Sequence, residues 1–264
     1  QLQFTCQRET VFSGIQRVLP GETLVVCAGQ IVERIHRVAL PLAPPEVWES
    51  QDAMAHLDQV FMDSVDIHQR SDVPYGMFLS GGIDSSALLA MMARLNEKPV
   101  QAFTIGFDGA GVHDEREHAR VVAAAAGATH EEVSFGESDF WDLLPTVAKA
   151  VDDPTADYAV LPTYKLARAA RNAGLKVVLS GEGGDEMFAG YGRYQRAARS
   201  RLLGGRNMRA AGQLEGLGVL RRAGRDWRQG IAELEADLPG DLSQLQRAQA
   251  IDCTHWLPND LLTK

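Results

Sequence analysis

Hydrophobic and polar positions along the middle of the chain alternate between two periods. Short apolar runs predict strands at 76–79, 100–106, 129–134 and 176–180. Between them, apolar residues recur at helical spacing and predict helices at 84–95, 115–126, 138–150 and 160–173. Alternation of strands and helices predicts a parallel sheet with helices on both faces. In such sheets, ligands bind beyond the carboxyl ends of the strands.

The two ends of the chain differ from this pattern. Two β-type runs at 23–27 and 30–34, separated by glycines, predict a hairpin within residues 11–36. Pro41, Pro44 and Pro45 mark a linker, and helical spacing resumes over 53–65. Residues 192–250 are rich in Arg and Gly, and their weak periodicity indicates helices without clear limits.

Composition narrows the class of protein. The chain has 264 residues, of which 45% are hydrophobic, enough for an α/β domain with a real core. Its formal net charge of −9 argues against binding to nucleic acid or acidic membranes, and no apolar run is long enough to span a bilayer. Cys6, Cys27 and Cys253 are scattered without metal-ligand spacing. These features favour a cytoplasmic enzyme with free thiols.

A string of small residues follows the strand at 76–79 and opens the next helix. It reads Ser80, Gly81, Gly82, Ile83, Asp84, Ser85, Ser86. Adjacent glycines admit a ligand close to the backbone, and the first-turn N–H groups of the helix attract anions, so the string predicts a phosphate cradle. No lysine follows, and Asp84 would repel phosphate unless Mg²⁺ lay between them. The alternative is a tight turn with a capped helix.

A second string follows the strand at 176–180. It reads Ser180, Gly181, Glu182, Gly183, Gly184, Asp185, Glu186 and continues to Tyr191. Glu182 and Asp185 are three residues apart, so both can face one space in a turn that leads into a helix. The alternative is a solvated acidic helix start, which the helix dipole favours. Because both strings follow strands of one predicted sheet, we expect them to converge on one ligand.

The two strings together resemble the synthetase domain of glutamine-hydrolysing asparagine synthetases. The first string alone resembles the pyrophosphate-binding loop (PP-loop) of many ATP pyrophosphatases, whereas the ordered pair is specific to the asparagine synthetase group. The resemblance implies an adenine nucleotide alpha hydrolase-like α/β fold. It also implies a remnant of an N-terminal glutaminase domain plus linker at 1–45, and a C-terminally truncated synthetase domain at 46–264.

The resemblance implies a reaction in two steps. The side-chain carboxylate of aspartate attacks the α-phosphorus of ATP and pyrophosphate leaves; ammonia then displaces AMP from β-aspartyl-AMP. The implied nucleotide ligands are Ser80, Gly81, Gly82, Ser85 and Ser86 at the phosphates, and the backbones of Leu79 and Ile105 at adenine. Asp84 and Asp185 would hold Mg²⁺. Ser180, Gly181 and Tyr191 would meet the intermediate, and Glu182 would take a proton from the attacking amine.

Two departures and two rival functions accompany the resemblance. Family members begin with a cysteine that hydrolyses glutamine, whereas this sequence begins at Gln1, so we expect a fragment that cannot draw ammonia from glutamine and a glutaminase domain in the parent chain. Lys264, the last residue, resembles the start of a further motif rather than the catalytic lysine. The same adenylation could serve another carboxylate, as in β-lactam synthetases or in amidotransferases for peptides or polysaccharide precursors. A non-catalytic ATP-binding module is the other alternative, and the sequence leaves open whether a homodimer forms.

Overall fold

The computed structural model describes residues 4–5, 8–37, 40, 46–109, 114–151, 155–200, 205, 208–219 and 227–263. They belong to two compact units. Unit 1 comprises residues 1–45, 151–157 and 183–264, and unit 2 comprises residues 46–150 and 158–182. The expected family domains at 1–45 and 46–264 stay a prediction, and the prolines at 41, 44 and 45 lie outside the described residues.

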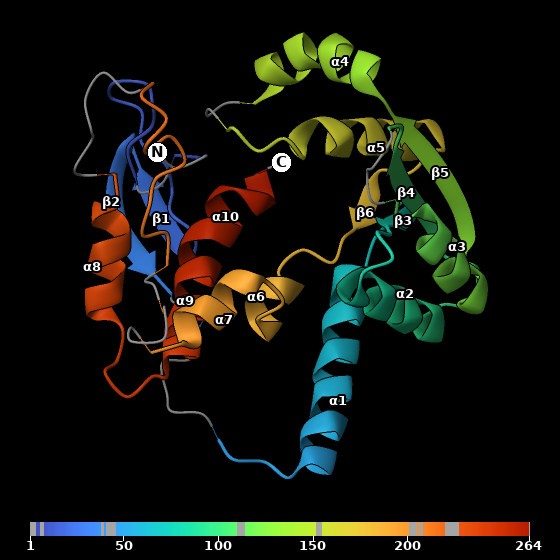
Figure 1. The fold of residues 1–264 in the computed structure, drawn as a ribbon, viewed down its shortest axis with the longest axis horizontal. Coiled ribbons are helices and arrows are strands. Elements are labelled where there is room, and N and C mark those ends of the chain that lie inside the picture. The colour runs from blue at the N-terminus through green and yellow to red at the C-terminus, as the bar shows by residue number, and fades with distance from the viewer. Residues whose placement is uncertain are drawn as a thin grey trace. The chain divides into compact units, whose positions relative to one another are not determined.

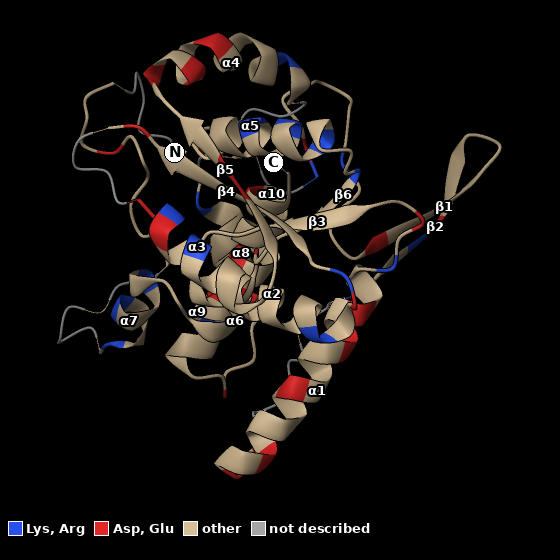
Figure 2. Cartoon of the chain, turned by 90° about the vertical axis from the view of Figure 1, so that its right-hand side faces the viewer, with Lys and Arg blue, Asp and Glu red and all other residues tan. Residues whose placement is uncertain are grey.

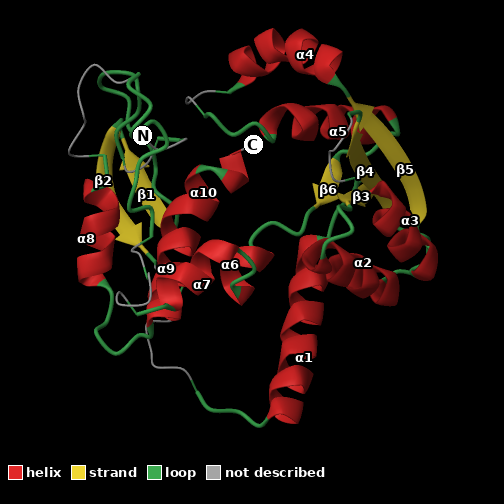
Figure 3. Cartoon of the chain, in the orientation of Figure 1, coloured by secondary structure: helices red, strands yellow, loops and turns green. Residues whose placement is uncertain are grey.

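The sheet of unit 2 is fully parallel, as the alternating pattern predicts. Its strands are β3 (Tyr75–Phe78), β4 (Gln101–Phe107), β5 (Thr129–Phe135) and β6 (Val177–Leu179), in the order β5-β4-β3-β6 (Figures 1 and 3). The carboxyl ends of β3 and β6, which are neighbours in the sheet, lead into the two small-residue strings.

Helices cover both faces of this sheet. On one face, α2 (Ile83–Leu95) and α3 (Arg116–Ala125) pack with α1 (Ser50–His68) around the fully buried Met77, Leu89 and Met92. On the other, α5 (Val160–Asn172) packs Leu166 and Ala170 against Phe103. Full burial of such a side chain stabilises the fold by about 1.5–3 kcal/mol. The two clusters confirm the predicted layers.

Helix α4 (Glu137–Ala150) packs against α5. Acidic residues cluster at its beginning and Lys149 lies in its last turn, which complements the helix dipole (Figure 2). Asp139 of α4 also pairs with Lys165 of α5 at 2.5 Å, so charge as well as packing joins the two helices.

Unit 1 holds the hairpin and a set of short helices. Strands β1 (Glu22–Cys27) and β2 (Gln30–His36) are antiparallel, which confirms the predicted hairpin. The helices are α6 (Gly184–Phe188), α7 (Gly192–Ala198), α8 (Gln229–Asp237), α9 (Gln244–Ile251) and α10 (Leu257–Asn259). A π-helical turn, Asp252–Trp256, joins α9 to α10, and a 3₁₀ turn spans Leu261–Thr263. The apolar core of unit 1 is centred on Tyr194, Ile231 and Ile251.

Candidate functional site

The first small-residue string forms a closed turn between β3 and α2. Gly81 has φ +79°, a conformation that favours glycine, and Gly82 precedes the first helical residue. The Ser80 hydroxyl accepts from the Gly82 N–H at 3.2 Å and lies 3.0 Å from the Ser85 hydroxyl. The Ser85 hydroxyl also accepts from the Ser80 N–H and donates to the Gly82 carbonyl, each at 3.2 Å. Serine hydroxyls therefore fix the shape of the loop.

The loop is packed closely by its neighbours in unit 2. A side chain at Gly81 would come within 3.0 Å of the Ala119 N–H and 3.2 Å of the His118 ring, at the start of α3. The Ser86 hydroxyl is buried and has no hydrogen-bond partner among the described residues.

The second string meets the first within unit 2. A Cβ on Gly181 would lie 2.9 Å from the Ser85 nitrogen and 3.2 Å from the Asp84 Cβ. Gly181 thus lies directly against the first turn of α2, and Ser180 and Glu182 flank it as exposed residues. This part of the second string therefore lies against the first, and the convergence of the two strings on one ligand stays a prediction.

Leu79 and Ile105 lie at neighbouring strand ends. Leu79 is buried, its N–H donates to the Phe103 carbonyl at 2.8 Å, and its carbonyl accepts from the Thr104 hydroxyl at 2.6 Å. Ile105 is half-buried against the α5 side of the sheet. The adenine contacts expected of these two backbones stay a prediction.

The remainder of the second string belongs to unit 1. Gly183 has φ +94° at the start of α6, and the Asp185 carboxylate lies over Gly190, where any side chain would clash with it. Glycine at position 190 therefore lets this carboxylate fold back over the turn. Asp84 and Asp185 lie in different units, and their joint role at a metal stays a prediction.

Tyr191 lies in a charged, largely buried cluster of unit 1. Burial and the nearby Glu186 and Asp185 carboxylates raise the pKa of the Tyr191 hydroxyl, so it stays protonated. The Arg193 guanidinium lies 3.9 Å from the centre of the Tyr191 ring and donates to Asp252 at 2.7 Å. Glu186 is fully buried, and burial raises the pKa of its carboxyl group. Arg193 therefore packs on the Tyr191 ring, and acidic groups lie near its hydroxyl.

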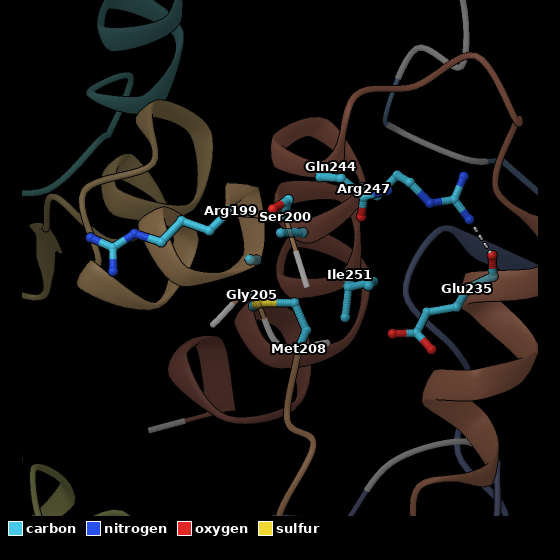
Figure 4. A pocket seen from close by; sticks show the side chains of 10 residues that line it. Arg199, Ser200, Gly205, Met208, Glu235, Gln244, Arg247 and Ile251 are labelled. Carbon is cyan, nitrogen blue, oxygen red and sulfur yellow. Dashed lines mark hydrogen bonds between the residues drawn. The ribbon is translucent and has the colours of Figure 1, made fainter. Parts of the chain in front are cut away.

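Unit 1 also has a separate cavity of about 350 Å³. Residues of α7, α8 and α9 line it, among them Glu235, Arg247 and Ile251 (Figure 4). The Arg247 guanidinium donates a hydrogen bond to the backbone carbonyl of Glu235 at 2.7 Å. Arg199 extends away from the other labelled side chains. No residue predicted for nucleotide or substrate binding lines this cavity.

A family model described as asparagine synthase matches residues 56–264. The chain belongs to the asparagine synthase family. It is 38% identical over 197 residues to a putative glutamine-hydrolysing asparagine synthetase of Mycobacterium bovis, covering 74% of this chain and 30% of the relative. It is 34% identical to asparagine synthetase 1 of Bacillus subtilis, covering 73% and 30% of the two chains. The chain therefore spans about 30% of the length of these relatives.

Among solved structures, an NH3-dependent NAD synthetase from Campylobacter jejuni aligns with a TM-score of 0.34 and 16% identity, covering 55% of this chain and 62% of that one.

Among the described residues, no helix combines the length and apolar character needed to cross a bilayer.

Sequence reasoning located the strings that mark this family, but it missed their supports. His130 stood out in the sequence as a strand histidine more typical of packing than of catalysis. Thr104, which contacts it behind the first loop, carried no signal, because their contact depends on the pairing of β4 with β5. Arg193 and Asp252 are 59 positions apart, and Arg193 lies in the stretch with weak periodicity, so their ion pair could not be predicted from the sequence. The alternation of small and acidic residues after strands was the signal that could be read.

Proposed function

We propose that this chain is the ATP-using part of an asparagine synthetase. It activates the side-chain carboxylate of aspartate as β-aspartyl-AMP, releases pyrophosphate, and transfers the activated acyl group to ammonia. The observation that carries the proposal is the match to the asparagine synthase family over 56–264, which includes both small-residue strings. The contact of Gly181 with Asp84 and Ser85 supports it, because two strings after separate strands meet at one loop.

The loop residues bind and orient the nucleotide. Ser80, Gly81 and Gly82 present the turn to the departing pyrophosphate, and Ser85 and Ser86 extend it into the first turn of α2. Leu79 and Ile105 offer backbone groups to adenine. Nucleotidyl transfer leaves a protein little covalent work, so the contribution of these residues is position and charge.

Asp84 and Asp185 fit magnesium. Within the described ranges, no group of three or more His, Cys, Asp or Glu side chains gathers as a metal site. Magnesium needs only one or two carboxylates when phosphate oxygens and water complete its shell. Gly181 lets the second string lie directly against Asp84, because a Cβ there would come within 3.2 Å of the Asp84 side chain. Bound Mg²⁺ would supply neutralisation of the phosphate charge.

The acyl-transfer step would use the second string. Ser180 and Gly181 contact the intermediate, and Tyr191 binds beside it with its hydroxyl protonated. Glu182, which is exposed at the end of unit 2, takes a proton from the attacking ammonia. The glutaminase domain of the parent chain would be the source of that ammonia.

A direct assay tests the proposal. The chain is incubated with ATP, Mg²⁺, ammonium and labelled aspartate, and AMP, pyrophosphate and labelled asparagine are measured. Glutamate and larger carboxylic acids replace aspartate in parallel reactions. Amide formed on another acid would favour the rival amidotransferases, and ATP binding without AMP release would favour a non-catalytic module.

Asp84→Asn is the matched variant, with Asp72→Asn at an exposed position as control. Asp84→Asn should remove the Mg²⁺-dependent part of ATP binding in calorimetry while the fold persists, because an amide is a poor magnesium ligand. Asp72→Asn should leave it unchanged. Equal Mg-ATP affinity in wild type and Asp84→Asn would remove Asp84 from the metal site.

A further inference from the structure

The peptide bond between Leu79 and Ser80, where β3 turns into the loop, is held at both ends by side-chain hydroxyls. Its carbonyl accepts from the Thr104 hydroxyl at 2.6 Å. Its N–H donates to the Ser85 hydroxyl at 3.2 Å. Thr104 and Ser85 are 1% and 5% exposed, and the Thr104 bond is buried, whereas the bond from the Ser80 N–H is partly buried. The plane of this peptide cannot rotate without breaking both hydrogen bonds.

Thr104 is itself held by His130 of β5. The two side chains are joined by a 2.7 Å contact between the Thr104 hydroxyl and His130 Nε2. A carbonyl only accepts, so the single Thr104 proton lies on the bond to Leu79, and His130 Nε2–H must donate to Thr104. Burial lowers the pKa of His130, and this effect outweighs the opposing effect of the Glu132 carboxylate. The ring is therefore neutral at neutral pH.

Packing alone does not account for a threonine at this position. Thr104 lies on β4 between strands of the core, and valine would occupy nearly the same volume without burying a hydroxyl. The hydroxyl instead extends a line of hydrogen bonds from β5 through β4 to the loop. The line continues from the Ser80 N–H to Ser85 and on to the Gly82 carbonyl.

We propose that Thr104 and His130 are positioning residues that fix the Leu79–Ser80 peptide and so hold the phosphate loop in its binding shape before nucleotide arrives. The proposal rests on the proposed function, in which this loop binds the polyphosphate of ATP. Neither residue needs to touch the nucleotide. Because the loop is already ordered, binding of the nucleotide costs less conformational entropy.

Three variants on β4 separate positioning from packing. Thr104→Val removes the hydroxyl, Thr104→Ser restores it, and Phe103→Leu disturbs the same strand on the α5 side. Hydrogen exchange without nucleotide should rise over residues 78–86 in Thr104→Val, stay near wild type in Thr104→Ser, and be unaffected there in Phe103→Leu. Mg-ATP affinity, measured by calorimetry, should fall about tenfold in Thr104→Val alone, since one net hydrogen bond and its consequences are lost.

A second pair of variants tests the hydrogen bond from His130 to Thr104. It also keeps the proposal testable if Thr104→Val does not fold. His130→Gln offers a side-chain N–H in place of Nε2, whereas His130→Leu does not. Faster loop exchange in His130→Leu than in His130→Gln supports the proposal. Unchanged exchange and affinity in Thr104→Val and His130→Leu would overturn it, as would equal losses in Thr104→Ser and Phe103→Leu. If wild type itself fails to bind Mg-ATP while the exchange pattern holds, the proposed function is wrong and the positioning of the loop stands.

Discussion

At the scale of single residues, Gly181 shows how closely the two strings approach. The atoms that a Cβ would meet there are the Ser85 nitrogen at 2.9 Å and the Asp84 carbonyl carbon at 3.2 Å. Both are backbone atoms, so they cannot rotate away. Gly181→Ala must displace the start of α2 or β6, and we expect a stability loss of about 1–3 kcal/mol, as for other overpacked sites.

The measurement is urea unfolding together with Mg-ATP calorimetry. Gly136→Ala is the matched control in unit 2, because its nearest neighbour atom is 3.9 Å away and its φ is not positive. The control should keep wild-type affinity. If Gly181→Ala binds Mg-ATP as wild type does, the close approach has no part in the site.

His255 is a second residue with a measurable consequence, for stability rather than binding. It is 6% exposed, and burial together with the Arg209 charge lowers its pKa to about 4. The folded pKa lies below the ordinary value of 6.5, so the unfolded chain binds the proton more tightly. The contribution of neutral His255 is therefore complete above pH 6.5 and is lost as the pH falls toward 4, by at most about 3 kcal/mol.

His255→Gln, which does not titrate, isolates this effect from the carboxylates. Unfolding free energy is measured for both proteins between pH 7.5 and 4.5 (roughly the window set by the shift). Wild type should lose more stability than His255→Gln over that range. Parallel curves would mean that the ring is hydrated in solution.

At the scale of elements, charge rather than apolar surface joins α7 to the π-helical turn. Fully buried Asp252 accepts from Arg193 at 2.7 Å and from Arg209 at 3.4 Å. Removing this fully buried anion leaves two half-buried guanidinium groups together, with Glu186 at 3.8 Å as the remaining acidic neighbour of Arg193, and should cost up to about 3 kcal/mol. Removing one arginine leaves Asp252 with the other.

We therefore predict that Asp252→Asn destabilises unit 1 more than Arg209→Met, with Arg193→Met between them. Arg193 makes the shorter bond and also stacks on Tyr191, so its loss should exceed that of Arg209. Urea unfolding of the three variants gives the order. A smaller loss in Asp252→Asn than in Arg209→Met would show that the two guanidinium groups are solvated rather than paired.

The elements differ in how far the sequence could predict them. Strands β3, β4 and β5 and helices α2 to α5 were predicted within a few residues, because each buries a continuous or regularly spaced apolar set. Helices α7, α8 and α9 are too short to show a clear period, and their core pairs Tyr194 with Ile231 and Ile251, which are distant in sequence. The Ser243 capping box does fix the start of α9, but a cap alone does not give the length of a helix.

The same limit applied to the candidate site. Residues that face a ligand from loops after strands could be read, because Gly, Ser and Asp in such places are unusual for a core. Residues that support them could not, since Thr104 reaches Leu79 and His130 only once the registers of β3, β4 and β5 are set. Register is a property of the paired sheet, not of one strand.

At the scale of the whole molecule, binding a polyanion must overcome an adverse overall charge. The chain has a formal net charge of −9, and its strings add carboxylates rather than lysines. Under the proposed function, attraction for ATP would come from local N–H groups, the α2 dipole and a cation that accompanies the nucleotide. The separate contributions of the Asp84, Glu182 and Asp185 carboxylates must then be measured in the complete reaction.

Glu182→Gln is the variant that separates the two chemical steps. Under the proposed function, Glu182 accepts a proton from ammonia after adenylation, so glutamine keeps the shape of the site but not the base. Exchange of labelled pyrophosphate into ATP, which reports adenylation, should stay within a few-fold of wild type. Asparagine formation should fall about 10²–10⁴-fold, the usual contribution of a general base. Both are measured with the full parent enzyme, supplied with ammonium so that glutamine hydrolysis plays no part, and Glu182→Asp tests whether a displaced carboxylate restores part of the second step. Equal losses in both steps would place Glu182 at the nucleotide or the metal, and no loss in either would make it a solvated residue at the start of α6.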